Sequence, residues 1–132
     1  TIVGLYQAFA EAGCPVTPFV ARPISWLGCD IECCSFSARV PGVVDGLSKL
    51  YREADMPGRV ELDVSDDLAM GTARALIRRG FPVGPSSGLN YAAAVEAAKR
   101  LGPQAQVVTV FPDRMERYFS TELILPRPKP ID

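Results

Sequence analysis

Residues 83–121, VGPSSGLNYAAAVEAAKRLGPQAQVVTVFPDRMERYFST, are the most informative part of this chain about its fold. A short apolar segment leads into a serine-containing turn, an alanine-rich segment follows, and a second apolar segment ends in Phe-Pro-Asp. A strand, a small polar turn and a helix in this order build a ligand pocket at the carboxyl edge of an α/β sheet. In the turn, Gly84 and Gly88 let a ligand approach the backbone, and Ser86 and Ser87 offer two hydroxyl groups. The pattern predicts where a ligand binds but not which ligand.

Helix and strand patterns alternate along most of the chain. The predicted helices cover 2–12, 47–53, 66–79 and 88–101, and the predicted strands cover 16–21, 60–64, 81–83 and 106–111. Apolar spacing assigns buried faces to two helices, with Leu5, Ala8, Phe9 and Ala12 in the first and Tyr91, Ala94, Val95, Ala98 and Leu101 in the last. Thr1 and Ser65 are the expected N-caps, and Gly13 and Gly80 the expected helix ends.

These patterns predict an α/β fold, with a mostly parallel sheet of about four strands flanked by helices. The domain would span residues 1–125 as one unit, because the 132 residues, 48% of them hydrophobic, suffice for one core. The tail at 126–132, with its repeated prolines, is expected to be loose. Residues 22–58 show no clear pattern.

Two blocks of this chain, GPSSGLNYAAAVEAAKRL and VVTVFPDRMERYFST, resemble the C-terminal half of the cysteine synthase and cystathionine β-synthase family. Members of that family carry a G-x-S-S-G-like turn and a P-D-S-x-E-R-Y-x-S-T segment. The chain departs from these motifs at Pro85 and Arg114. The opening TIVGLYQAF is similar to the helix that follows the family's G-x-G-G-T phosphate loop. The resemblance implies the large-domain half of a fold type II enzyme that depends on pyridoxal phosphate.

The resemblance also implies roles for individual residues. Ser86 aligns with the hydroxyl that faces the pyridine nitrogen of the cofactor, whereas Ser87 is expected to cap the following helix. Gly84 belongs to the same turn. Thr1 matches the phosphate-loop threonine, although a plain N-cap explains it equally well. Asp113 is expected to pair with an arginine or to cap a turn, and Arg117 and Tyr118 to pack the C-terminal segment.

The resemblance places the Schiff-base lysine and the glycine-rich loop upstream of Thr1, so we expect the chain to be a fragment, a truncated product or one piece of a split chain. Three lysines remain as substitutes, and none lies in a sequence context that favours a Schiff base; these are Lys49, Lys99 and Lys129. No catalytic residue is therefore assigned. The expected partners are a small amino-acid substrate, a missing N-terminal segment or second chain, and a second copy of the chain in a homodimer.

Composition excludes several classes of protein. Lys+Arg of 14 against Asp+Glu of 15 gives a net charge of −1, and no basic stripe favours nucleic acid. No apolar run approaches the roughly 20 residues of a membrane helix, and no signal peptide is visible. The cysteines at 14, 29, 33 and 34, without any histidine, fit reduced thiols of a cytoplasmic protein better than an all-cysteine metal site.

Two classes of function follow. The chain is either the C-terminal portion of a cysteine synthase-like enzyme, which performs β-replacement or β-elimination on an activated serine, or a truncated non-catalytic module that binds a partner or a small anion.

Overall fold

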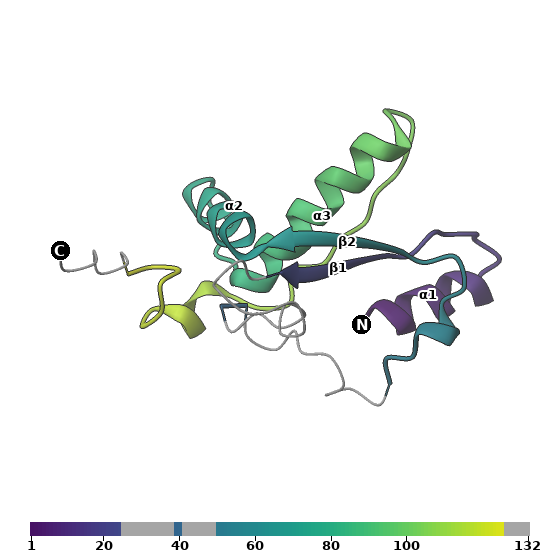
Figure 1. Cartoon of the computed structure of the whole chain (residues 1–132), viewed down its shortest axis with the longest axis horizontal. Helices are drawn as coiled ribbons and strands as arrows, with labels where there is room; N and C mark the ends of the chain where they lie inside the picture. The colour runs from purple at the N-terminus through teal and green to yellow at the C-terminus, as the bar shows by residue number, and fades with distance from the viewer. Residues whose placement is uncertain (25–38, 41–49, 126–132) are drawn as a thin grey trace.

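The computed structural model describes residues 1–24, 39–40 and 50–125. In this part the chain contains three α-helices, two strands and two short 3-10 helices (Figure 1). In chain order these are α1 (Ile2–Glu11), β1 (Phe19–Ile24), η1 (Glu53–Asp55), β2 (Val60–Ser65), α2 (Asp66–Arg78), α3 (Pro85–Leu101) and η2 (Met115–Tyr118).

The sheet consists of β1 and β2, which pair in parallel from Phe19 opposite Val60 to Ile24 opposite Ser65. Helices α2 and α3 lie on one side of this pair, and α1 lies apart beside the amino-terminal end of β1 (Figure 1). The predicted α/β class with a parallel sheet flanked by helices is confirmed. The sheet has two strands within the described residues, however, instead of about four.

The two missing strands are the predicted ones at 81–83 and 106–111. The first contributes an isolated antiparallel bridge between Val83 and Arg114. The second forms no strand, and within the described part of the chain its backbone makes no backbone–backbone hydrogen bond. An apolar segment becomes a strand when a neighbour satisfies its N–H and C=O groups, and no described segment lies alongside 106–111 in that way.

Helix α2 forms where the sequence predicts it. The Ser65 hydroxyl accepts a hydrogen bond from the Leu68 N–H at 3.2 Å, so Ser65 is a true N-cap. Asp66 and Asp67 occupy the first turn, where carboxylates favour the helix dipole. Gly80 follows with φ of 91°, a left-handed conformation that terminates helices.

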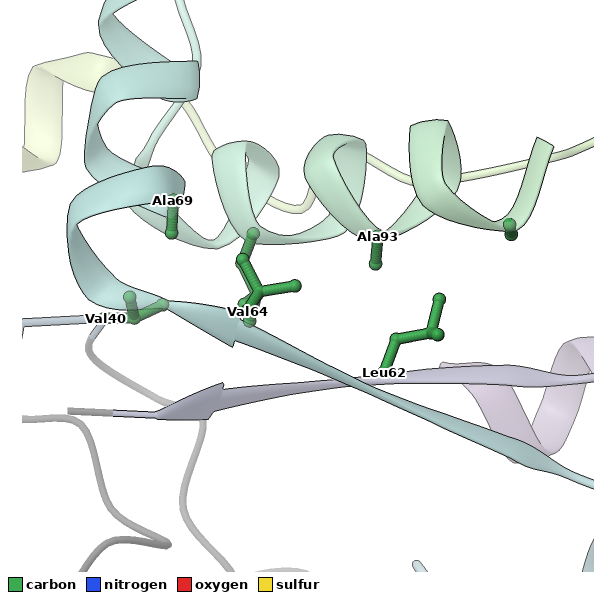
Figure 2. Packing of buried hydrophobic residues seen from close by; sticks show 7 residues of the cluster. Val40, Leu62, Val64, Ala69 and Ala93 are labelled. Carbon is green, nitrogen blue, oxygen red and sulfur yellow. The ribbon is translucent and has the colours of Figure 1, made fainter. Parts of the chain in front are cut away.

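The main core lies between the sheet and the two helices α2 and α3 (Figure 2). Its buried members are Val40, Leu62, Val64, Ala69, Leu89, Ala93 and Ala97. Helix α3 therefore buries Leu89, Ala93 and Ala97, and the prediction that it buries Tyr91, Ala94, Val95, Ala98 and Leu101 is wrong. Small side chains on the buried face let α3 approach the sheet and α2 closely, and the larger Tyr91, Val95 and Leu101 remain exposed.

A second cluster joins α2 to the C-terminal segment. Met70, Ala73, Tyr118 and Leu123 are buried together. The Arg74 guanidinium donates hydrogen bonds to the backbone oxygens of Glu122 and Leu123, the latter at 3.2 Å. Burial of Tyr118 confirms that it packs this segment, whereas Arg117 is exposed.

Other boundaries differ modestly from prediction. Helix α1 confirms the predicted helix and ends before Gly13, with φ of 70°, but none of its residues is buried, so its predicted core face is wrong. Strand β1 begins at Phe19 instead of residue 16. Of the predicted helix at 47–53, residues 47–49 lie outside the described residues, residues 50–52 are not helical, and Glu53 begins the 3-10 helix η1. The predicted tail at 126–132 lies outside them entirely. None of the described helices is long and apolar enough to cross a membrane.

Candidate functional site at the start of helix α3

The serine turn becomes the first turn of α3. The helix begins at Pro85, so Gly84 is its N-cap and both serines lie inside the helix. Proline suits this position because its fixed φ is helical and it has no N–H to leave unpaired. The arrowheads of β1 and β2 point towards the end of the molecule where α3 begins (Figure 1). The structure thus brings the strands' carboxyl ends and a helix N-terminus to the same end, as the sequence predicts.

The Ser87 side chain is fully buried, and its hydroxyl has no hydrogen-bond partner among the described residues. Its backbone N–H donates to the Gly84 oxygen at 3.1 Å. The expectation that Ser87 caps the helix is therefore wrong. The helix starts three residues earlier than Gly88, the predicted start, and the cap position falls on a glycine that has no side chain to accept a hydrogen bond.

The Ser86 side chain is half-buried, and no hydrogen bond of its hydroxyl occurs within the described part of the chain. It lies in the first turn of α3, where the backbone N–H groups and the helix dipole favour anionic or electron-rich groups. Of the two serine hydroxyls, that of Ser86 is the one within reach of solvent.

Gly84 lies against the C-terminal segment. A Cβ atom at this position would lie 2.5 Å from Tyr118 Cε2 and 3.1 Å from Asp113 Cγ, and closer still to Asp113 Oδ1. The backbone is therefore in direct contact with these two side chains. Because Gly84 has no side chain, the side chains of Asp113 and Tyr118 fit directly against its backbone.

Asp113 joins the turn by both its backbone and its side chain. Its backbone oxygen accepts a hydrogen bond from the Gly84 N–H at 3.2 Å, and Oδ2 accepts one from the Tyr118 hydroxyl. Oδ1 is buried without a partner among the described residues. The prediction of an arginine partner is wrong within the described residues: the segment after Phe111 folds back over the turn, and this brings tyrosine to the carboxylate.

Burial and the hydrogen bond to Asp113 raise the pKa of Tyr118 to about 12 from the ordinary value of 10.0. As the pH rises, the Tyr118 hydroxyl loses its proton in the unfolded chain before it does so in the folded chain. The free energy of unfolding therefore falls as the pH rises from 10 to about 12. We expect a loss of at most about 3 kcal/mol over that interval. Urea unfolding at several pH values measures it. In Tyr118→Phe the free energy of unfolding should fall less over this pH interval, whereas in Tyr91→Phe it should fall as in the unmodified chain. An equal fall in Tyr118→Phe would contradict the assignment of the raised pKa to Tyr118.

Thr1 precedes α1 at the N-cap position, but its side chain makes no capping hydrogen bond. Its backbone oxygen accepts from the Leu5 N–H at 3.0 Å. Among the described residues no hydrogen bond joins Thr1 to the serine turn. The plain capping role is thus not seen for the Thr1 hydroxyl.

The remaining residues named from the sequence are lysines and cysteines. Lys99 lies exposed in the last turn of α3. Lys49 and Lys129 lie outside the described residues, as do the cysteines at 29, 33 and 34. Cys14 is an exposed free thiol. Within the described ranges no group of three potential metal ligands occurs.

Sequence reasoning missed the contact between Gly84, Asp113 and Tyr118. Its members are separated by about thirty residues of chain, and no local pattern links them. The sequence shows only two separate motifs, the serine turn and the P-D-x-x-E-R-Y segment. These motifs come together only because the chain folds back. Asp66, in the first turn of α2, was also missed as a buried carboxylate without a partner among the described residues.

Comparison with known proteins relates this chain to a class of enzymes. No family model matches the chain. The chain is 48% identical over 63 residues to a probable cysteine synthase of Bacillus subtilis, and 42% identical over 62 residues to cysteine synthase B of Campylobacter jejuni. Each match covers 47% of this chain and only 20% of the relative, so the matched region spans about a fifth of the length of these relatives.

A solved structure matches the whole chain. It is a variant of a hydrogen sulfide-producing enzyme in complex with an α-aminoacrylate intermediate, and the TM-score is 0.75 at 25% sequence identity. The match covers 100% of this chain and 39% of that enzyme. The fold is therefore that of a fold type II enzyme dependent on pyridoxal phosphate. The resemblance to the cysteine synthase family is confirmed, and over about 47% of the chain its homologues are cysteine synthases.

Proposed function

We propose that the chain is the C-terminal portion of a cysteine synthase-like enzyme that uses pyridoxal phosphate for β-replacement or β-elimination on an activated serine. The 48% identity over 63 residues to the Bacillus subtilis relative carries the proposal. The turn at the start of α3, at the carboxyl end of a parallel sheet, supports it because such turns bind phosphorylated and electron-rich ligands.

The residues of the turn fit the cofactor at one position. The Ser86 hydroxyl, half-buried and without a partner among the described residues, is available to a ring nitrogen. Gly84 is not open to a ligand on its α-carbon side, because Asp113 and Tyr118 occupy that space. We therefore propose that Ser86 binds the pyridine ring of the cofactor and that Thr1 binds its phosphate. Gly84 and Ser87 are proposed to support the structure of the turn.

Pyridoxal phosphate, when bound, supplies an electron sink for the bond that breaks at the substrate. The contribution of this chain would be a neutral hydrogen-bonding group at the ring nitrogen. Because the Ser86 hydroxyl carries no charge, it does not hold a proton on that nitrogen as a carboxylate would. The resulting weaker electron withdrawal suits β-elimination.

The two serines should respond differently to substitution in the complete enzyme. We expect Ser86→Ala to slow elimination about tenfold, the loss that corresponds to one hydrogen bond of about 1.4 kcal/mol. Ser87→Ala removes a buried hydroxyl without a described partner, so stability should change by less than about 0.5 kcal/mol or increase. Steady-state rates and urea unfolding measure the two effects. A rate loss confined to Ser87→Ala would reverse the assignment.

The lysine that binds the cofactor covalently is proposed to come from another part of the enzyme or from a second chain. Incubated alone with pyridoxal phosphate and then borohydride, the 132-residue chain should retain less than about 0.1 equivalent of reduced adduct. Mass spectrometry of the treated chain provides the measurement. A stoichiometric adduct on one lysine would contradict this, and Lys49 would be the first residue to inspect.

The complete enzyme would accept a small amino-acid substrate and work as a homodimer. We also propose a cytoplasmic location, which the exposed free thiol of Cys14 supports because exposed thiols persist in reducing compartments.

A further inference from the structure

A carboxylate lies at the N-terminus of helix α3. Gly84 is the N-cap residue, and a Cβ atom added there would overlap Asp113 Oδ1. This oxygen is buried and has no hydrogen-bond partner among the described residues. The carboxylate of Asp113 is therefore in direct contact with the start of the helix, two residues before Ser86.

Two contacts fix the position of this carboxylate. The Tyr118 hydroxyl donates a hydrogen bond to Asp113 Oδ2, and the Gly84 N–H donates one to the Asp113 backbone oxygen at 3.2 Å. No lysine or arginine of the described residues forms an ion pair with Asp113. Because the tyrosine hydroxyl carries no charge, the negative charge of the carboxylate is not neutralised and acts on any group that binds nearby.

The same helix end has few free backbone donors. Pro85 has no N–H, and the Gly84 N–H is bonded to Asp113. The Ser87 N–H donates to the Gly84 oxygen at 3.1 Å. From residue 84 to residue 87, this leaves the Ser86 N–H without a partner in the part of the chain that the structure describes. Helix ends that bind phosphate offer several N–H groups to it, and α3 does not.

The side chains of the turn add one accessible polar group. The Ser86 side chain is half-buried, whereas the Ser87 hydroxyl is fully buried. A ligand that reaches the start of α3 therefore meets one N–H, one neutral hydroxyl and the nearby carboxylate of Asp113. These groups suit an uncharged hydrogen-bond acceptor. They disfavour a phosphate or a carboxylate, because the charge of Asp113 repels both.

We propose that Asp113 is a specificity-determining residue, which excludes phosphate and carboxylate groups from the N-terminus of α3 and leaves this place to an uncharged hydrogen-bond acceptor. Helix N-termini ordinarily attract anions, so the fixed carboxylate reverses the usual preference. The inference rests on the proposed function in taking this turn as part of the cofactor site. It follows that the phosphate of the cofactor and the carboxylate of an amino-acid substrate bind elsewhere in the enzyme.

Sulfate tests the exclusion on the 132-residue chain, because it is a dianion of the same shape as phosphate and needs no cofactor or second chain. The amide chemical shifts of residues 86–88, followed by NMR at neutral pH, report its binding to this helix end. We expect Asp113→Asn to bind sulfate there at least about tenfold more tightly than the unmodified chain, because the substitution removes a negative charge close to a dianion. The asparagine oxygen can still accept from the Tyr118 hydroxyl.

Glu116→Gln is the matched control. It removes the same charge from the same segment, but Glu116 is exposed and forms an ion pair with Arg114 at 2.7 Å. Sulfate should therefore bind this variant as weakly as it binds the unmodified chain. If Asp113→Asn does not fold, Asp113→Ser provides a second uncharged replacement with an oxygen that accepts a hydrogen bond.

Saturable sulfate binding at the amides of residues 86–88 in the unmodified chain would overturn the inference, and this measurement needs no variant. Equal affinity in the unmodified chain and in the folded Asp113 variant would overturn it as well. The proposed function can fail separately. If Ser86→Ala leaves elimination by the complete enzyme unchanged, the proposed contact with the cofactor ring is refuted, whereas the exclusion of anions by Asp113 is not.

Discussion

Gly88→Ala should destabilise the chain by about 3 kcal/mol or more, a larger effect than alanine would have at any other glycine that the structure describes. The two helices α2 and α3 cross at this residue. An added Cβ would lie 2.7 Å from the Ala73 N and 2.8 Å from the Ala73 Cβ, and would overlap the Ala69 backbone oxygen. Backbone atoms of a helix cannot swing aside as a side chain does, so the helices would have to separate. Urea unfolding monitored by circular dichroism measures the loss.

Gly71→Ala is the matched control, because it adds the same methyl group to an α-helical glycine. At Gly71, in α2, an added Cβ has no atom within 4 Å. Alanine should therefore stabilise the chain by about 0.5–1 kcal/mol through its higher helix propensity. If Gly88→Ala unfolds at the same urea concentration as the unmodified chain, the close crossing of α2 and α3 is wrong.

Gly84→Ala should cost about 2 kcal/mol or more and disturb the start of α3. The added methyl group would meet Asp113 Oδ1 and lie 2.5 Å from Tyr118 Cε2. To accommodate it, Asp113 must move away, and this movement breaks the hydrogen bond that the Tyr118 hydroxyl donates. Thermal unfolding of the single variant gives the cost.

A double-mutant cycle with Asp113→Ala separates the contact from a general effect of alanine at an N-cap. In the Asp113→Ala background one of the two obstacles is gone, so Gly84→Ala should cost at least about 1 kcal/mol less than it does alone. The Tyr118 contact prevents complete recovery. Additive costs would mean that Gly84 and Asp113 do not touch.

Local sequence signals alone correctly predicted helix α2 and the existence of helix α3. Ser65, two aspartates in the first turn and Gly80 specify the ends of α2 without reference to the rest of the molecule. Local sequence signals likewise specify helix α1, which ends before Gly13. The alternation of helix and strand also predicted a mostly parallel sheet, since parallel strands require a long connection between them, and β1 and β2 do pair in parallel.

The face that α3 buries was decided by tertiary packing. Two apolar faces compete on this helix, and the larger side chains of Tyr91, Val95 and Leu101 favoured the wrong one. The structure buries Leu89, Ala93 and Ala97, because Gly88 and the small residues in line with it permit the close approach to α2 that bulky side chains would prevent.

Residues near one another in the chain specified both ends of α2, the end of α1 before Gly13, the parallel α/β class and the resemblance to cysteine synthases. Tertiary structure decided two further features. Among the residues that the structure describes, 106–111 has no strand partner, and a strand needs hydrogen bonds from a neighbour. Tertiary structure also set Asp113 and Tyr118 against Gly84, because a contact across about thirty residues depends on how the chain folds back and not on local preference.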